Sequence, residues 1–189
     1  MKKLAISVAL CTLLGTSFAS HASLTASADG KTVYDSELKL TWLADANYSQ
    51  TSGYHSSGNM NWDDANNGWA GNLNFAGHSD WRLPTIGEIT ELRHELGGST
   101  GSLFNNHNSN FNLFTNFSND WYWTSTGDSN DATKATAYHL NLGAPNVADV
   151  NNGYRAMAVS AVPEPETYAM LLAGLGLIGA MTRRRKQIS

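Results

Sequence analysis

Three oxygen-bearing side chains, those of Asp128, Asn130 and Asp131, lie within four residues of one another in a polar segment. Carboxylate and amide oxygens are the ligands that Ca²⁺ prefers, and a short turn after a strand can gather them around one ion. Asp120, before the same predicted strand, is a further candidate ligand. A solvated turn has the same composition, so the pattern allows either a calcium site or an ordinary surface loop.

Aromatic side chains suggest a second kind of ligand. Trp81, Trp121 and Trp123 can stack on sugar rings, because an aromatic face suits axial C–H groups. The same tryptophans can instead form the core, which is the interpretation we favour for all six in the chain. Arg82, beside Trp81, either contacts a ligand or donates to carbonyls or a carboxylate beneath a helix start, and we favour the structural role.

Other chemistries lack the residues they need. The single cysteine, Cys11, lies in the predicted leader described below, which leaves the rest of the chain without a disulfide or thiol nucleophile. The histidines follow no His-x-x-x-His or Cys/His pattern, which disfavours zinc. Ser125 has no nucleophile-elbow context, and no Gly-rich phosphate loop follows a strand. We therefore expect a protein that is not an enzyme, with no cofactor beyond the candidate calcium.

The most regular predicted element follows the stretch Asp80-Trp81-Arg82-Leu83-Pro84-Thr85. Pro84 fixes its own φ at about −65° and keeps Leu83 extended. Thr85 is then the expected N-cap, and Glu88 completes a capping box. Helical spacing of apolar residues predicts a helix that ends at Gly97-Gly98. Its buried face comprises Ile86, Ile89, Leu92 and Leu96, and its solvated faces comprise Glu88, Glu91, Arg93 and Glu95.

The rest of the chain predicts strands on both sides of two helices. Polar, Gly-rich and Asn-rich composition predicts loops at 44–61 and 99–119, and a second helix begins at Trp62, with Asn61 as its cap. Alternating or β-branched and aromatic segments predict strands within 31–43, at 121–126, at 135–142 and at 154–162. This order predicts an α+β domain with a mostly antiparallel sheet, two flanking helices and a long loop.

The N-terminal segment, residues 1–22, has the features of a secretory signal peptide. Lys2 and Lys3 precede an apolar run, and Ser20-His21-Ala22 supplies small residues at a cleavage site. We expect this segment to form a signal helix outside the core. Its expected partners are the Sec export machinery and signal peptidase.

The C-terminal segment, residues 163–189, combines three features. Pro163, Glu164 and Pro165 precede an apolar run at 168–181, and a basic cluster follows, comprising Arg183, Arg184, Arg185 and Lys186. About fourteen residues rising ~1.5 Å each span roughly 21 Å, less than the ~30 Å hydrocarbon core. The basic cluster is expected to keep the tail in the cytoplasm. These features resemble the PEP-CTERM sorting signal, which exosortase reads in Gram-negative bacteria that make exopolysaccharide. The alternative to a sorting signal is that this hydrophobic transmembrane helix is a permanent anchor, which spans the membrane once.

The segments between residues 33 and 160 resemble a known family in their order: a Leu-x-Leu-x-Trp strand, the Trp62 helix, the stretch from Asp80, the strand around Trp123, and a closing Tyr154-Arg155 strand. They are similar to the bacterial secreted family named for the C-terminal domain of the collagen-like adhesin Lcl. The resemblance implies a C-type-lectin-like fold for residues 23–162, in which the terminal strands pair. It also implies a structural family motif formed by Asp80, Trp81, Arg82, Leu83, Pro84 and Trp123.

Charge and resemblance together limit the function. Residues 23–162 carry six Lys and Arg against fourteen Asp and Glu, a net charge of −8, which disfavours nucleic-acid binding. We expect an exported protein that passes the inner membrane and reaches the cell surface or matrix. Its expected role is non-catalytic recognition of glycan or protein, with exopolysaccharide as a candidate partner. A purely structural matrix component and a polysaccharide hydrolase are the alternatives.

Overall fold

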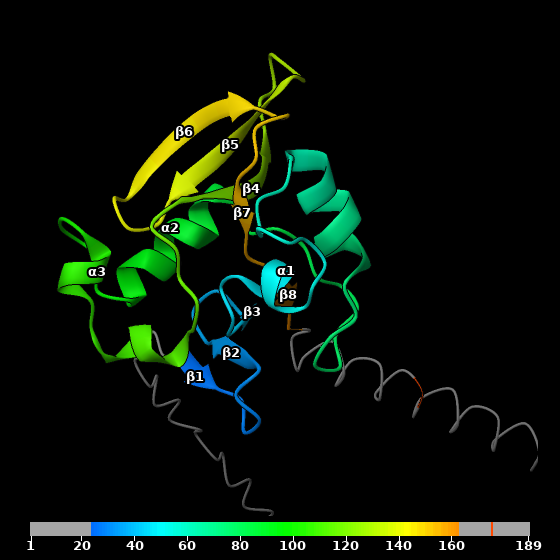
Figure 1. Ribbon diagram of the computed structural model, residues 1–189. Coiled ribbons are helices and arrows are strands. Elements are labelled where there is room, and N and C mark those ends of the chain that lie inside the picture. The colour runs from blue at the N-terminus through cyan, green and yellow to red at the C-terminus, as the bar shows by residue number, and fades with distance from the viewer. Residues whose placement is uncertain (1–23, 163–174, 176–189) are drawn as a thin grey trace, which may run out of the picture.

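The computed structural model describes residues 24–162 and Leu175 (Figure 1). Residues 24–162 form an α+β domain, as the sequence predicts. Its elements follow in the order β1 (Leu24–Ala26), β2 (Thr32–Asp35), β3 (Leu40–Leu43), α1 (Tyr48–Thr51), η1 (Asp64–Trp69), η2 (Ala70–Asn72), α2 (Ile86–Glu95), α3 (Leu103–Asn106), η3 (Ser109–Leu113), β4 (Trp121–Gly127), β5 (Lys134–His139), β6 (Ala144–Asp149), β7 (Arg155–Ala156) and β8 (Val159–Ala161).

The strands form two four-stranded sheets, so the prediction of a single sheet is wrong. One sheet has the order β1-β2-β3-β8 and is antiparallel throughout. The other has the order β6-β5-β4-β7, and its β4–β7 pair is parallel. In the first sheet Leu40 pairs with Ala161 and Trp42 with Val159. The predicted pairing of the first and last parts of the domain is therefore confirmed.

The closing segment belongs to both sheets, although its composition predicts one continuous strand at 154–162. β7 pairs with β4, and β8 pairs with β3. Met157 and Ala158 connect the two strands and are both fully buried. Because residues on both sides of this crossing are apolar and covered, the sequence shows no polar break where the chain changes sheets.

Helix α2 has the N-terminus that the sequence predicts. The Thr85 hydroxyl accepts the Glu88 backbone N–H at 3.2 Å, and the Glu88 carboxylate accepts the Thr85 N–H at 2.7 Å. Ile89 and Leu92 are fully buried, as is Leu96, which follows the last helical residue. Gly97 then adopts φ +93°, a left-handed conformation that ends the helix.

The capping box is testable with an isosteric change. Thr85→Val keeps the shape and the extended backbone of the cap but removes the hydroxyl. We expect the free energy of unfolding to fall by about 1 kcal/mol, measured by urea denaturation followed by tryptophan fluorescence. Thr90→Val is the matched control, because the Thr90 hydroxyl only donates to the Ile86 carbonyl one turn back. An equal loss in both variants would contradict a capping role.

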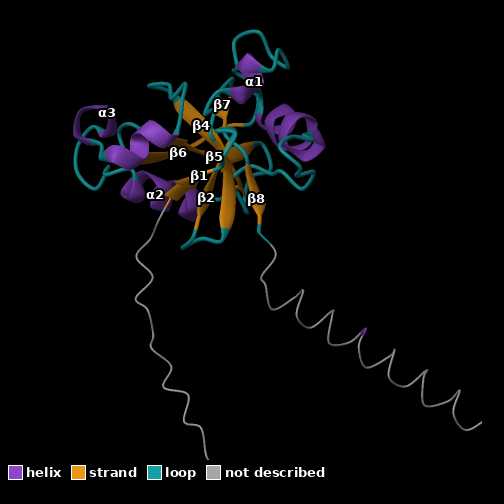
Figure 2. Cartoon of the chain, turned by 90° about the horizontal axis from the view of Figure 1, so that it is seen from below, coloured by secondary structure: helices purple, strands orange, loops and turns teal. Residues whose placement is uncertain are grey.

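The second predicted helix exists, but its geometry is not α-helical beyond its first residues. Asn61 caps it as predicted, since its side-chain oxygen accepts the Asp64 N–H at 2.8 Å. The segment then continues as the π-helix η1 and the 3₁₀-helix η2. Gly68 and Gly71 fall in this region, and glycine allows the backbone to depart from α-helical geometry at low cost. This segment and α2 lie on opposite sides of the strands (Figures 1 and 2).

Two apolar clusters form the core. One gathers around Trp42, Tyr122 and the buried face of α2, and the other around Trp69, Trp81 and Trp123. The 99–119 segment is not a plain loop, because it contains α3 and η3. Its Phe residues pack against the first cluster.

Three predicted solvated positions of α2 are buried or paired instead. Arg93 is 5% exposed, the Glu95 carboxylate oxygens are inaccessible, and Glu88 pairs with Arg82. Among residues 24–162 and Leu175, no helix has the length and apolarity to cross a bilayer. The predicted signal helix at 1–22 and the hydrophobic helix within 163–189 lie, apart from Leu175, outside the described residues.

Candidate functional site

The candidate calcium ligands do not come together. Asp128, Asn130 and Asp131 lie in the turn between β4 and β5, whereas Asp120 precedes the other end of β4. Seven strand residues at about 3.3 Å each separate them by roughly 23 Å. Asp128 accepts the Asn130 N–H, and Asp131 accepts the N–H and hydroxyl of Thr133. Asp120 pairs with Arg155 at 3.5 Å. These contacts are those of an ordinary polar turn.

Most candidate stacking tryptophans are covered by the protein. Trp123 is fully buried and donates its indole N–H to the Met60 carbonyl at 2.8 Å. Trp81 is 3% exposed and donates to the Phe75 carbonyl. Trp121 is half-buried against His139 and Tyr154. Trp81 and Trp123 therefore serve the core, and a sugar ring cannot reach their faces.

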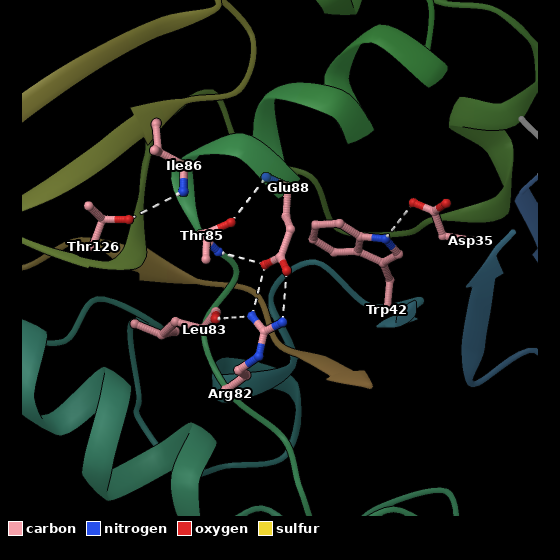
Figure 3. A network of polar contacts seen from close by, with 8 residues as sticks. All are labelled: Asp35, Trp42, Arg82, Leu83, Thr85, Ile86, Glu88 and Thr126. Atoms are coloured by element: carbon pink, nitrogen blue, oxygen red, sulfur yellow. Dashed lines mark hydrogen bonds and ion pairs between the residues drawn. The ribbon is translucent and has the colours of Figure 1, made fainter. Parts of the chain in front are cut away.

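The Asp80–Thr85 stretch joins both sheets to α2. The backbone of Arg82 exchanges two hydrogen bonds with Val159 of β8, and Pro84 accepts the Ser125 N–H of β4. The Arg82 guanidinium donates to the Leu83 carbonyl and to both Glu88 oxygens, at 2.7 and 2.8 Å (Figure 3). Its donors are thus directed at the helix start and not at a ligand, in agreement with the structural role.

Arg82 and Glu88 stabilise each other's charged forms. Burial raises the pKa of the Glu88 carboxyl, but the hydrogen bonds from Arg82 and Thr85 outweigh it and leave this pKa below its usual value. The hydrogen bonds with Glu88 raise the pKa of Arg82. Each group therefore stabilises the charged form of the other, and neither is free to exchange protons with a substrate near neutral pH.

A serine, a histidine and a carboxylate meet beside β8, but in the wrong order for catalysis. The Ser160 hydroxyl donates to Asp80 at 2.6 Å and contacts His78 Nδ1 at 2.9 Å. A serine nucleophile must instead give its proton to the histidine, which the carboxylate orients from the far side. Ser160 is also fully buried. The contact fixes the loop before Trp81 to β8.

A pair of carboxyl groups, Asp35 and Glu95, is equally covered. Asp35 is fully buried, and both Glu95 oxygens are inaccessible to solvent. The two side chains are close enough to share a hydrogen bond. Glycosidase carboxyl pairs stand about 5–9 Å apart with the sugar between them, so this pair has no room for a substrate.

An open pocket of about 160 Å³ lies on another part of the molecule. Five segments form it: the turn before β2, the end of β3, α1, the Phe75 region and the loop before β4. Its walls comprise Gly30, Lys31, Leu43, Asp45, Tyr48, Phe75 and Thr115. We refer to these seven residues as the Tyr48–Phe75 pocket.

The pocket combines two aromatic rings with charged and hydroxyl groups. The rings of Tyr48 and Phe75 lie 4.4 Å apart between centroids, and Lys31 Nζ lies 5.9 Å from the centre of the Phe75 ring. A backbone bridge holds Asp45 beside Thr115. Asp45 Oδ1 accepts the Asn47 N–H, and within the described residues Asp45 Oδ2 and the Thr115 hydroxyl have no hydrogen-bond partner. The pocket therefore offers free polar groups next to apolar ring surface.

Sequence reasoning missed this site. Tyr48 falls in a segment whose Gly- and Ser-rich composition predicts only a loop, and Phe75 lies between two predicted elements. The pocket residues come from positions up to 85 apart in the chain, and no spacing rule connects them. The one signal in the sequence is the presence of Tyr48 and Phe75, two large aromatics, in otherwise polar segments.

Comparison with known proteins gives two matches. A family model described as the Lcl C-terminal domain matches residues 31–160, which include every pocket residue except Gly30. A model described as the PEP-CTERM protein-sorting motif matches residues 161–186. The second match indicates export through the membrane, processing by an exosortase, and a surface or extracellular location. No curated protein matches the chain.

Proposed function

This chain belongs to the Lcl C-terminal domain family, and on that premise we propose that it is a non-catalytic glycan-recognition protein of the bacterial surface or matrix. The Tyr48–Phe75 pocket is the observation that carries the proposal, because ligand pockets typically combine aromatic surface with a few hydrogen-bonding groups. We further propose a C-type-lectin-like fold, which the pairing of β3 with β8 supports. We also propose that the Sec machinery exports the protein and that its host is a Gram-negative bacterium that makes an exopolysaccharide.

Three observations weigh against the hydrolase alternative. The Asp35 and Glu95 carboxyls are covered and adjacent, and Ser160 is buried with its proton directed at Asp80. The pocket itself contains one carboxylate, Asp45, whereas glycoside hydrolysis ordinarily needs two on opposite sides of the scissile bond. Recognition without turnover is the function that these side chains support.

The proposal is tested with the exported protein purified from the cells that produce it and with their own exopolysaccharide. We expect saturable co-sedimentation with the polymer and no release of new reducing ends during prolonged incubation. Binding that fails to saturate would favour a purely structural matrix component. Turnover of the polymer would contradict the non-catalytic role.

A further inference from the structure

We propose that the Tyr48–Phe75 pocket holds one neutral pyranose residue, with C–H groups of the sugar against the surface that the paired Phe75 and Tyr48 rings leave open and its hydroxyls on Asp45, Thr115 and Lys31. This inference rests on the proposed glycan recognition and adds the ligand class and the residues that bind it. In Figure 1, β3 leads into α1, and these two elements supply Leu43 and Tyr48 of the pocket.

The size of the pocket limits the ligand to one ring. A cavity of about 150 Å³ accommodates a benzene molecule, whereas drug-sized ligands occupy about 300–1,000 Å³. The pocket, at about 160 Å³, therefore has no room for more than one sugar ring. Because it is open to solvent, the neighbouring residues of a polysaccharide can continue outside it.

The polar groups are placed for hydroxyls. Asp45 is held in position by the Asn47 N–H at Oδ1, which leaves Oδ2 as a charged acceptor for a sugar hydroxyl. Thr115 lies beside it across the backbone bridge and can donate or accept. Lys31, whose Nζ lies 5.9 Å from the centre of the Phe75 ring, is a further donor in the pocket wall. Adjacent acceptor and donor groups match the vicinal hydroxyls of a pyranose.

Charge favours a neutral sugar over an acidic one. Asp29 lies 3.3 Å from Lys31 Nζ and compensates its charge, so Asp45 dominates the pocket. The surrounding domain also carries a net charge of −8. A uronic acid or sulfated sugar would place its anion against Asp45 within this negative field. A neutral pyranose meets no such repulsion.

The test uses the exported full protein and three probes: methyl α-glucoside, methyl α-mannoside and methyl β-galactoside. Saturation-transfer NMR should detect binding of at least one, with a dissociation constant on the order of 1–10 mM. Glucuronate should bind at least about tenfold more weakly than the best neutral probe. Absence of saturable binding for all three glycosides would overturn the inference.

Two variants connect the binding to this pocket. Phe75→Ala removes the stacking surface, and Asp45→Asn removes the charge while its amide oxygen still accepts the Asn47 N–H. Each should weaken binding at least about tenfold. Tyr54→Ala, an exposed aromatic outside the pocket, is the control and should change nothing. Unchanged affinity in both pocket variants would overturn the inference.

The polymer experiment separates this inference from the proposed function. If Asp45→Asn and Phe75→Ala still bind the exopolysaccharide as the parent does, glycan recognition stands and the pocket assignment is wrong. If the parent protein binds no polymer, the proposed function itself is wrong. Equal urea midpoints for parent and Asp45→Asn confirm that a loss of binding does not come from unfolding.

Discussion

Arg93→Met should lower the free energy of unfolding by roughly 3 kcal/mol. Arg93 is 5% exposed and donates from Nε to the Leu140 carbonyl at 2.9 Å and from Nη2 to the Gly101 carbonyl at 2.6 Å. Methionine has a comparable apolar stem but no donor, so both carbonyls lose a charged partner. Because domains are stable by only about 5–15 kcal/mol, the loss is a large fraction of the total.

The Arg93 guanidinium lies directly against Gly143, where a side chain would not fit. A Cβ on Gly143 would lie 2.6 Å from Arg93 Cζ, and Gly143 has φ +71°. The side chain therefore connects α2 to the turn between β5 and β6 and to the loop after α2. Urea denaturation with tryptophan fluorescence measures the effect, which should appear in the midpoint with an unchanged slope.

Two further variants define what the Arg93 result means. His94→Met changes the exposed neighbour on the same helix and should stay within about 0.5 kcal/mol of the parent. Arg93→Lys keeps the charge but offers a single donor position in place of a fork, so its loss should be intermediate. If Arg93→Met is as stable as the parent, the two carbonyls have other donors and the connecting role is wrong.

The sequence predicts the parts of this fold that local chemistry decides. The α2 capping box depends on Thr85 and Glu88, three residues apart, and was predicted in detail. The Asn61 cap was predicted for the same reason. The pairing of β3 with β8 followed from the family resemblance. Each of these features depends on residues that are close in sequence or on an order of segments that a family shares.

What the sequence does not predict depends on distant packing. Helical periodicity places Arg93 and Glu95 away from the apolar stripe, but it cannot show that other segments cover those faces. The division of 154–162 between two sheets depends on which strand each half contacts. The pocket likewise requires five separate segments to meet. In each case the structure depends on contacts with residues that are far away in the sequence.

The Asp35–Glu95 contact makes the stability of the domain depend on pH. Asp35 accepts N–H groups from Glu37, Leu38 and the Trp42 indole, at 2.9–3.3 Å. Glu95 has no donor among the described residues and faces Asp35, Glu37 and Glu91. Burial, and then the charge and hydrogen bond of Asp35, raise the pKa of Glu95 to about 8. The two adjacent carboxyl groups are therefore expected to share a proton below about pH 8.

The folded protein should lose stability as the pH rises. The pKa of Glu95 is raised from 4.5 to about 8 on folding, so the folded state binds more protons between these values. The stabilisation is complete below pH 4.5 and is lost as the pH rises through 8. We expect a loss of roughly 1–2 kcal/mol from this group, less than the full shift implies, because Glu95 as a residue is only partly buried and nearby solvent screens charges even though the carboxylate oxygens are covered.

Glu95→Gln should remove this dependence. The glutamine amide can donate to Asp35 at every pH, so the urea midpoint of the variant should stay nearly constant between pH 5 and 9, while that of the parent falls. Above pH 8 the variant should be the more stable protein, because the parent then holds two adjacent carboxylates. Asp131→Asn is the control, since it removes the same charge from an exposed turn and should keep the parent's profile. A parent midpoint that does not change from pH 5 to 9 would show that Glu95 is ionised throughout and that the shared proton does not exist.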